Sequence, residues 1–175
     1  MQELSIPKLR VAVLIGTKGE TKRKIERATN TKLKISKEGD VLIEGESLDC
    51  FVTEKIVMAV GRGFNPDVAL KLKNEDYVLE IINITDYTGK SVKKFTRIKA
   101  RLIGTKGKAR KVFERLTNTN VVIYGKTVSV IGKSKNVGDA VEGIKYLLEG
   151  APHGNVYKFL ENAIKKRKWQ QKRMS

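Results

Sequence analysis

The stretch LIGTKGETKRKIERATNTKLKI at Leu14–Ile35 returns as LIGTKGKARKVFERLTNTNVVI at Leu102–Ile123. The two copies start 88 residues apart (102 − 14), and about half of their aligned positions are identical. Agreement over this length indicates an internal duplication. A period of this size is far too long for a solenoid repeat, so we predict two tandem domains of about 75–90 residues each.

Both halves of the chain show the same order of secondary-structure signals around the repeated stretch. The first half predicts a strand at 3–6, helices at 8–14, 20–29 and 47–60, and hairpin strands at 32–36 and 41–44. The second half predicts a strand at 77–84, helices at 91–102, 108–116 and 134–148, and hairpin strands at 121–124 and 127–131. Asn30 and Asn118 stand where a left-handed residue ends the middle helix. The fold class is therefore α+β, ordered β-α-α-β-β-α in each half.

The last helix of each half has a candidate cap and an apolar face. Ser47 and Ser134 are expected to cap these helices through their side-chain oxygens. Apolar residues recur at helical spacing in both helices, and we expect them to face the core. They are Leu48, Phe51, Val52, Ile56 and Val60 in the first half, and Val137, Val141, Ile144 and Leu148 in the second.

The regions outside the repeat also have recognisable patterns. Asn65 followed by Pro66 is a cap-and-first-turn signal, which predicts a short helix at 66–72. Val156–Lys168 has the pattern of an amphipathic helix that the first half lacks, and it ends in the basic run Lys165–Trp169. We divide the chain into a first domain at 1–63, a connector at 64–76, a second domain at 77–151 and a basic C-terminal helix and tail at 152–175.

Positive charge is concentrated in the second half. The chain has 36 Lys and Arg against 19 Asp and Glu, a formal net charge of +17. Residues 1–88 have 14 of each sign, so the whole excess lies in residues 89–175. An excess of this size indicates a polyanionic partner, either nucleic acid or an acidic membrane surface.

The repeated Gly-x-x-Gly, lying between two predicted helices, suits the binding of phosphate. Glycine adopts positive φ without steric cost, so the pair permits a tight reversal of the chain. Backbone N–H groups at the start of the next helix, together with the helix dipole, favour an anion there. Lys18 and Lys106, between the glycines, each add a positive charge.

Several other functions find no support in the sequence. The chain has no phosphate-binding loop of the nucleotide-hydrolase type and no dinucleotide-binding glycine motif, so no cofactor is expected. With one His and one Cys it cannot assemble a Cys/His zinc cluster or a Cys–His catalytic pair, and we predict no metal site and no enzymatic activity. The single Cys50 and the lack of a signal-peptide pattern favour a cytoplasmic location.

Ile-Gly-Thr-Lys-Gly within β-α-α-β-β-α is similar to the type I KH domain of RNA-binding proteins. In that family the Gly-x-x-Gly loop holds the backbone of about four single-stranded nucleotides. The resemblance implies a loop at Gly104–Gly107, a groove floor at Ile103 and a facing wall at Val121 and Ile123. The corresponding loop in the first half is Gly16–Gly19, with Ile15 at the floor. KH domains commonly have an apolar residue three positions after the second glycine, where this chain has Lys22 and Arg110.

A narrower resemblance covers nearly the whole chain. The runs Thr96–Gly104, Tyr124–Val128 and His153–Glu161, with Gly61–Pro66 in the connector, resemble the partner-of-Nob pre-ribosomal KH protein family, and the compact length resembles its archaeal members. The resemblance implies binding near the 3′ end of small-subunit (16S) ribosomal RNA during maturation. It also implies the Nob-type endonuclease and the alpha subunit of translation initiation factor two as partners. The alternatives are a KH adaptor of an RNA-degrading complex or a messenger-RNA binder, and a structural docking protein with incidental RNA affinity.

Comparing the repeats predicts that the second domain is the main RNA reader. Apolar Val11 and Val13 are replaced by Lys99 and Arg101, and Glu20 is replaced by Lys108. The first domain is expected to bind RNA weakly or to act as a docking surface. The candidate RNA-binding residues are Arg97, Lys99, Arg101, Ile103, Gly104, Thr105, Lys106, Gly107, Lys108, Arg110, Lys111, Val121 and Ile123. The weaker second site comprises Ile15, Gly16, Thr17, Lys18, Gly19, Lys22 and Arg23.

Overall fold

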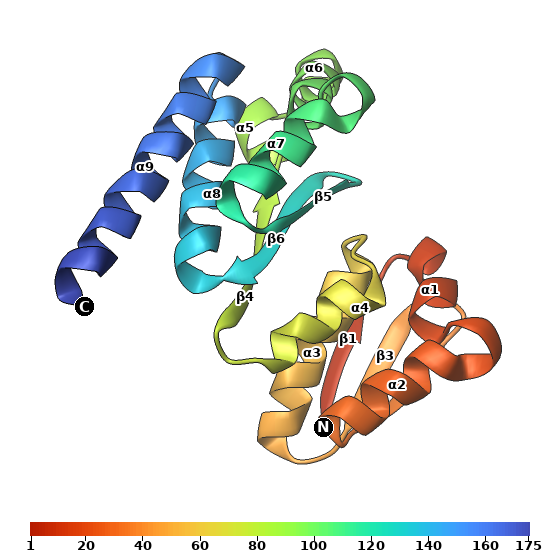
Figure 1. Cartoon of the computed structure of the whole chain (residues 1–175). Coiled ribbons are helices and arrows are strands. Elements are labelled where there is room, and N and C mark those ends of the chain that lie inside the picture. The colour runs from red at the N-terminus through yellow and green to blue at the C-terminus, as the bar shows by residue number, and fades with distance from the viewer. The chain divides into compact units, whose positions relative to one another are not determined.

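The computed structural model describes all 175 residues (Figure 1). The chain forms two compact units, Met1–Leu79 and Glu80–Ser175, which are described separately. Each contains a three-stranded sheet and helices, and no helix combines the length and the apolar character that a membrane crossing would need. The predicted α+β class is confirmed.

The first unit is built on a sheet with the strand order β1-β3-β2. The central strand β3 (Asp40–Glu44) pairs antiparallel with β1 (Gln2–Ser5) and with β2 (Lys32–Ile35). Its helices are α1 (Val11–Ile15), α2 (Glu20–Thr29) and α3 (Ser47–Gly61), and a 3-10 turn at Lys8–Arg10 precedes α1. The helices bury Leu14, Ile25 and Ile56 completely, so the core of this unit is apolar.

The connector folds onto this first unit. Asn65 caps α4 (Pro66–Ala69) by accepting a 2.8 Å hydrogen bond from the Asp67 N–H, and a 3-10 turn at Leu70–Lys73 follows. Both pack against α3, and Phe64, Ala69 and Leu72 are buried. The predicted short helix is therefore present.

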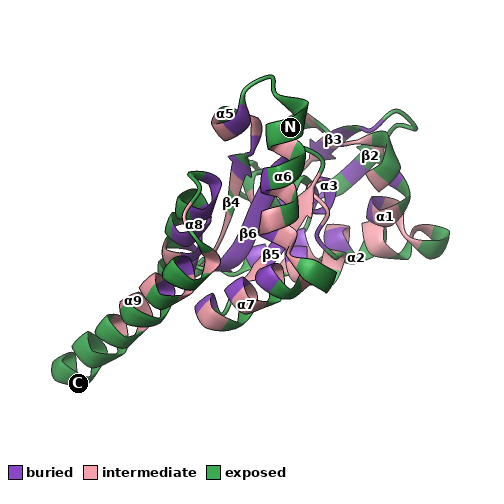
Figure 2. Ribbon diagram, turned by 90° about the horizontal axis from the view of Figure 1, so that it is seen from above, coloured by how far each residue is buried: buried purple, intermediate pink, exposed green.

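The second unit repeats the architecture and adds two helices. Its sheet has the order β4-β6-β5, in which β4 is Tyr77–Asn83, β6 is Thr127–Lys133 and β5 is Asn120–Tyr124. Strand β6 is buried along six of its seven residues. Its ribbon is purple in Figure 2. The repeated helices are α6 (Val92–Ile103), α7 (Lys108–Thr117) and α8 (Ser134–Leu148). The additions are α5 (Thr85–Thr88), which the sequence analysis did not anticipate, and the long α9 (His153–Met174).

The two units repeat side-chain contacts as well as elements. The Glu26 carboxylate accepts a hydrogen bond from the Leu33 N–H at 2.8 Å, and Glu114 accepts one from Val121 at 2.9 Å. These bonds fix the end of the middle helix against the start of the hairpin. Asn30 and Asn118 adopt the left-handed conformation predicted for them, with φ of 54° and 52°. The internal duplication is therefore visible in the hydrogen bonds.

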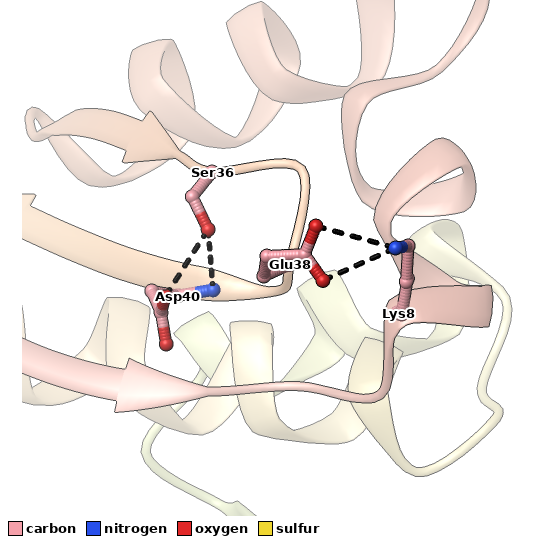
Figure 3. Close-up of polar contacts among 4 residues, drawn as sticks. All are labelled: Lys8, Ser36, Glu38 and Asp40. Carbon is pink, nitrogen blue, oxygen red and sulfur yellow. Dashed lines mark hydrogen bonds and ion pairs between the residues drawn. The ribbon is translucent and has the colours of Figure 1, made fainter.

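The hairpin turn between β2 and β3 is fixed to the rest of the first unit (Figure 3). Lys8 forms an ion pair with Glu38 at 3.1 Å, and the Asp40 N–H donates to the Ser36 hydroxyl at 3.0 Å. The Ile6 N–H donates to the Gly39 carbonyl at 2.9 Å. In the second unit the Ile84 N–H donates to the Lys126 carbonyl at the same distance, so each first strand is tied to its hairpin.

Two expectations about the last helices were wrong. Ser47 and Ser134 are the first residues of α3 and α8 rather than their caps, and neither helix has a side-chain cap. Leu48 and Phe51 are exposed, whereas Cys50 and Thr53 face the core. Apolar residues lie on several faces of α3, so helical spacing alone did not identify its buried face. In α8, Val137, Ile144 and Leu148 are buried, as expected, but Val141 is only partly buried.

Candidate nucleic-acid interface

Both Gly-x-x-Gly loops have a backbone that strongly favours glycine at its ends. Gly104 has φ 73° and ψ 172°, and Gly107 is left-handed with φ 74°. Gly16 and Gly19 match these angles within two degrees. A Cβ atom added to Gly104 would lie 2.7 Å from the Ala109 nitrogen. Both the positive φ and this lack of space therefore exclude larger residues at this position.

The lysine inside each loop is held in a left-handed conformation. Lys106 has φ 55° and ψ 30°, and Lys18 has φ 53° and ψ 28°. Few lysines adopt such angles. Lys106 is exposed and stands beside the start of α7, which has no side-chain N-cap. A full positive charge and a helix N-terminus therefore meet at one loop, a combination that favours phosphate.

The sequence around the second loop is free of carboxylates. Residues 87–113 contain ten Lys and Arg and no Asp or Glu. The side chains of Arg97, Lys106, Lys108 and Lys111 are exposed, and Thr105 beside them is exposed as well. These exposed cations can attract the phosphates of a nucleic acid.

Three other predicted cations have partners within the protein. Lys99 donates to the Gly125 carbonyl at 2.9 Å. Arg101 donates to the carbonyls of Leu147 at 3.3 Å and Ala151 at 2.6 Å, where α8 ends. Arg110 pairs with Glu114 at 3.1 Å beside β5. These contacts position the cations and occupy part of their donor capacity.

Helix α6 carries candidate residues on two sides of its buried face. Ile98 and Leu102 point into the core. At 100° per residue, Lys99 and Ile103 lie on one side of them, toward the β5–β6 hairpin. Arg97 and Arg101 lie on the other side. The loop residues Gly104–Gly107 directly follow the C-terminal end of the helix.

On the hairpin side, the apolar candidates differ in exposure. Ile103 and Ile123 are partly exposed, so they can offer apolar surface to a base. Val121 is only 2% exposed and packs inside the unit. Of the two β5 candidates, only Ile123 therefore has surface that a base could contact.

On the other side of α6 the structure forms a pocket that the sequence analysis missed. It has a volume of about 480 Å³ and is lined by residues of α6, the loop, α7 and α9. His153 and Tyr157 come from α9, and the other lining residues are Arg97, Ala100, Arg101, Gly104, Thr105, Lys108 and Ala109. In the sequence analysis, the run His153–Glu161 supported the family resemblance but was not assigned to the RNA site.

The two α9 residues are held firmly at this pocket. The His153 Nε2 donates to the Arg101 carbonyl at 2.8 Å, since a carbonyl only accepts. Tyr157 packs edge-on against Phe113 with 6.0 Å between ring centroids. Burial raises the pKa of the Tyr157 phenol above its usual 10, so the hydroxyl stays protonated at neutral pH.

The loop of the first unit has more mixed surroundings. Thr17 and Lys18 are exposed, but Glu20 stands in the first turn of α2. Lys24 pairs with Asp67 at 2.7 Å, and this hydrogen bond raises the pKa of Lys24. The remaining candidates of the weaker site differ in exposure: Arg23 is exposed, and Ile15 and Lys22 are partly buried. No group of three or more His, Cys, Asp or Glu in the chain is placed to hold a metal ion.

Comparisons with known proteins agree with this geometry. A model of the eukaryotic-type KH domain (KH-domain type I) of PNO1 matches residues 78–165, and a general KH-domain model matches residues 1–58. A KH domain-containing protein of Methanocaldococcus jannaschii is 46% identical over 168 residues, which cover 93% of this chain and 74% of that protein. The pre-rRNA-processing protein pno1 of Aspergillus fumigatus is 31% identical over 106 residues, which cover 59% and 42%.

A solved structure is similar to nearly the whole chain. A chain in the crystal structure of the a/eIF2alpha–aDim2p–rRNA complex from Pyrococcus horikoshii OT3 is 42% identical and superposes with a TM-score of 0.86. The match covers 94% of each chain. By contrast, the chain spans less than half of the length of the Aspergillus protein.

Proposed function

Since this chain belongs to the family of type I KH-domain proteins related to PNO1, we propose that it is a non-catalytic protein that binds single-stranded ribosomal RNA during maturation of the small ribosomal subunit. The observation that carries the proposal is the second Gly-x-x-Gly loop. It joins a helix N-terminus, an exposed Lys106 and a stretch of sequence, residues 87–113, that has ten Lys and Arg and no carboxylate. Together, these features fit the binding of a ribose-phosphate strand.

The relatives support ribosomal RNA as the substrate class. The Pyrococcus relative was crystallised in a complex with rRNA and a/eIF2alpha. We take the alpha subunit of translation initiation factor two as a partner on this basis. The resemblance to the partner-of-Nob family supports two finer assignments, the 3′ region of 16S ribosomal RNA and the Nob-type endonuclease. The single Cys50 supports a cytoplasmic location.

The second unit is the main reader in this proposal. Lys108 replaces Glu20 at the start of the helix after the loop, and this exchange turns repulsion of phosphate into attraction. The first unit binds RNA weakly or offers a docking surface. Its zero net charge over residues 1–88 gives a polyanion no general attraction.

Matched loop variants test this assignment. We expect Thr105→Asp with Lys106→Asp to weaken binding of short single-stranded RNA at least about 10-fold, because two negative charges replace the phosphate site. Asp tolerates the left-handed conformation of position 106, so the change tests charge more than backbone. Thr17→Asp with Lys18→Asp is the matched control in the first unit and should cost less. Affinities are measured by fluorescence anisotropy at fixed salt, and equal losses from both pairs would refute the division of labour.

A further inference from the structure

We propose that the pocket between α6, α7 and α9 is a second nucleotide site, which holds one nucleotide flanking the strand held by the Gly104–Gly107 loop. The inference rests on the proposed function and names a further part of that RNA site. In this reading, His153 and Tyr157 are base-contacting residues. The Gly104–Gly107 loop and the pocket beside α9 would then act on one strand that passes over the loop.

The walls of the pocket suit the parts of a nucleotide. Arg97 and Lys108 are exposed cations at its rim, and no carboxylate lines it. Three of the lining residues, Ala100, Gly104 and Ala109, are small and leave room for a flat ring. A volume of about 480 Å³ is large enough for one nucleotide and lies within the usual range of ligand pockets.

Two polar groups of the lining residues are free to contact a base. The Tyr157 hydroxyl lies on a partly buried ring, makes no hydrogen bond within the chain and stays protonated, so it can donate to a base edge. The His153 Nε2 is committed to the Arg101 carbonyl, which leaves Nδ1 as an acceptor in the neutral ring. A donor and an acceptor beside an aromatic ring are the chemistry that reads an unpaired base.

The pocket has a boundary that confines a negatively charged ligand. Arg97 and Arg101 also line a neighbouring hollow, which contains Asp86 and Glu149. Those carboxylates repel phosphate, so the strand is favoured on the loop side of the arginines. In the first unit the short α4 stands where α9 begins in the second, and the hollow beside the first loop contains Glu20 and no aromatic ring. The site therefore belongs to the second unit alone.

RNA length separates this site from the loop itself. Full-length protein is titrated into fluorescent RNA pools of random sequence, four and eight nucleotides long. We expect Tyr157→Leu to weaken binding of the eight-nucleotide pool about 5-fold or more and to change the four-nucleotide pool less than about 2-fold, since base stacking on an aromatic ring is lost. Tyr157→Phe removes only the hydroxyl, and we expect a loss of about 2- to 10-fold on the longer pool.

Tyr146→Leu is the matched control. Tyr146 also packs edge-on against a phenylalanine, Phe159 at 5.1 Å, but it lies outside the pocket. We expect it to leave both affinities unchanged, and thermal melting monitors the fold of every variant. Tyr157 variants that weaken both pools equally, or neither pool, would overturn the second site. If the unchanged protein binds neither pool, the proposed function itself fails and takes this site with it.

Discussion

At the scale of single residues, the two units use arginines at different helix positions to make the same contact. In the first unit, Arg10 donates to the carbonyls of Val60 at 2.8 Å and Phe64 at 2.9 Å. In the second, Arg101 donates to the equivalent carbonyls of Leu147 and Ala151. In the alignment of the two repeats, Arg10 corresponds to an apolar residue of the second unit, and Arg101 corresponds to Val13 of the first. The two arginine positions are therefore about one helical turn apart. The exchange of Val13 for Arg101 therefore moves a structural contact and is not simply a cation added for RNA.

This position gives a prediction about stability. We expect Arg101→Gln to lower the free energy of unfolding by about 1.5–3 kcal/mol, because partly buried charge-assisted hydrogen bonds to α8 are lost. Lys106→Gln, which changes an exposed loop cation, should alter the same quantity by less than about 0.5 kcal/mol. Urea denaturation measures both. An Arg101→Gln protein of unchanged stability that binds RNA poorly would instead assign Arg101 to the RNA alone.

The first glycine of the loop gives a second residue-scale prediction. Gly104→Ala should cost about 1–3 kcal/mol in unfolding free energy from its backbone conformation, with a further cost from the overlap with Ala109. Gly125→Ala is a suitable comparison, because Gly125 also has positive φ but has nothing within 4 Å of an added Cβ. We expect it to cost about 1 kcal/mol. Urea midpoints of the two variants that coincide would show that space around Gly104 is irrelevant.

At the scale of elements, α9 is what distinguishes the second unit from the first. It packs on α7 and α8 and is anchored along its length. Val156 and Leu160 are buried near its start. Further along, Arg167 pairs with Asp139 and donates to the Asn136 side chain at 2.8 Å. Arg167 is thus part of the helix packing, whereas its neighbours Lys165, Lys166 and Lys168 are exposed.

Hydrogen exchange can test this anchor. We expect Arg167→Gln to lower the free energy of unfolding by about 1.5–3 kcal/mol and to speed amide exchange in residues 161–174, since the contact to Asp139 and Asn136 is lost. Lys166→Gln removes a neighbouring charge that makes no such contact and should leave both quantities unchanged. Equal exchange in the two variants would mean that Arg167 does not hold the helix.

Elements with local signals were predictable, and those decided by distant contacts were not. Helix α2 runs from Glu20 to Thr29 as predicted, because glycine and asparagine punctuate both its ends. In α3, Ile56 and Val60 are buried as predicted, but Leu48 and Phe51 are exposed, because the sheet and α4 decide which apolar residues are covered. The loop at Gly104–Gly107 was visible in sequence through its glycines. The loop and Tyr157, 53 residues after Gly104, line the same pocket because of how α9 packs, and no local sequence pattern indicates this.

At the scale of the whole molecule, the charge asymmetry makes the salt dependence of binding diagnostic. Four nucleotides on one loop bring about three or four phosphates, and each contributes about −0.7 to the slope of log K against log salt. We expect a slope of roughly −2 to −3 if the second unit alone binds the strand. Equal use of both units would give roughly twice that value.

The slope is measured by titrating RNA at several salt concentrations with the unchanged protein and the two loop variants. Thr17→Asp with Lys18→Asp should leave the slope unchanged, because the first unit contributes few phosphate contacts. Thr105→Asp with Lys106→Asp should flatten it toward zero along with the affinity. A slope near −5 for the unchanged protein, halved by either pair, would instead show that both units hold the strand equally. The charge excess of residues 89–175 favours the first result, since residues 1–88 have no net charge and are expected to displace few counterions from the RNA.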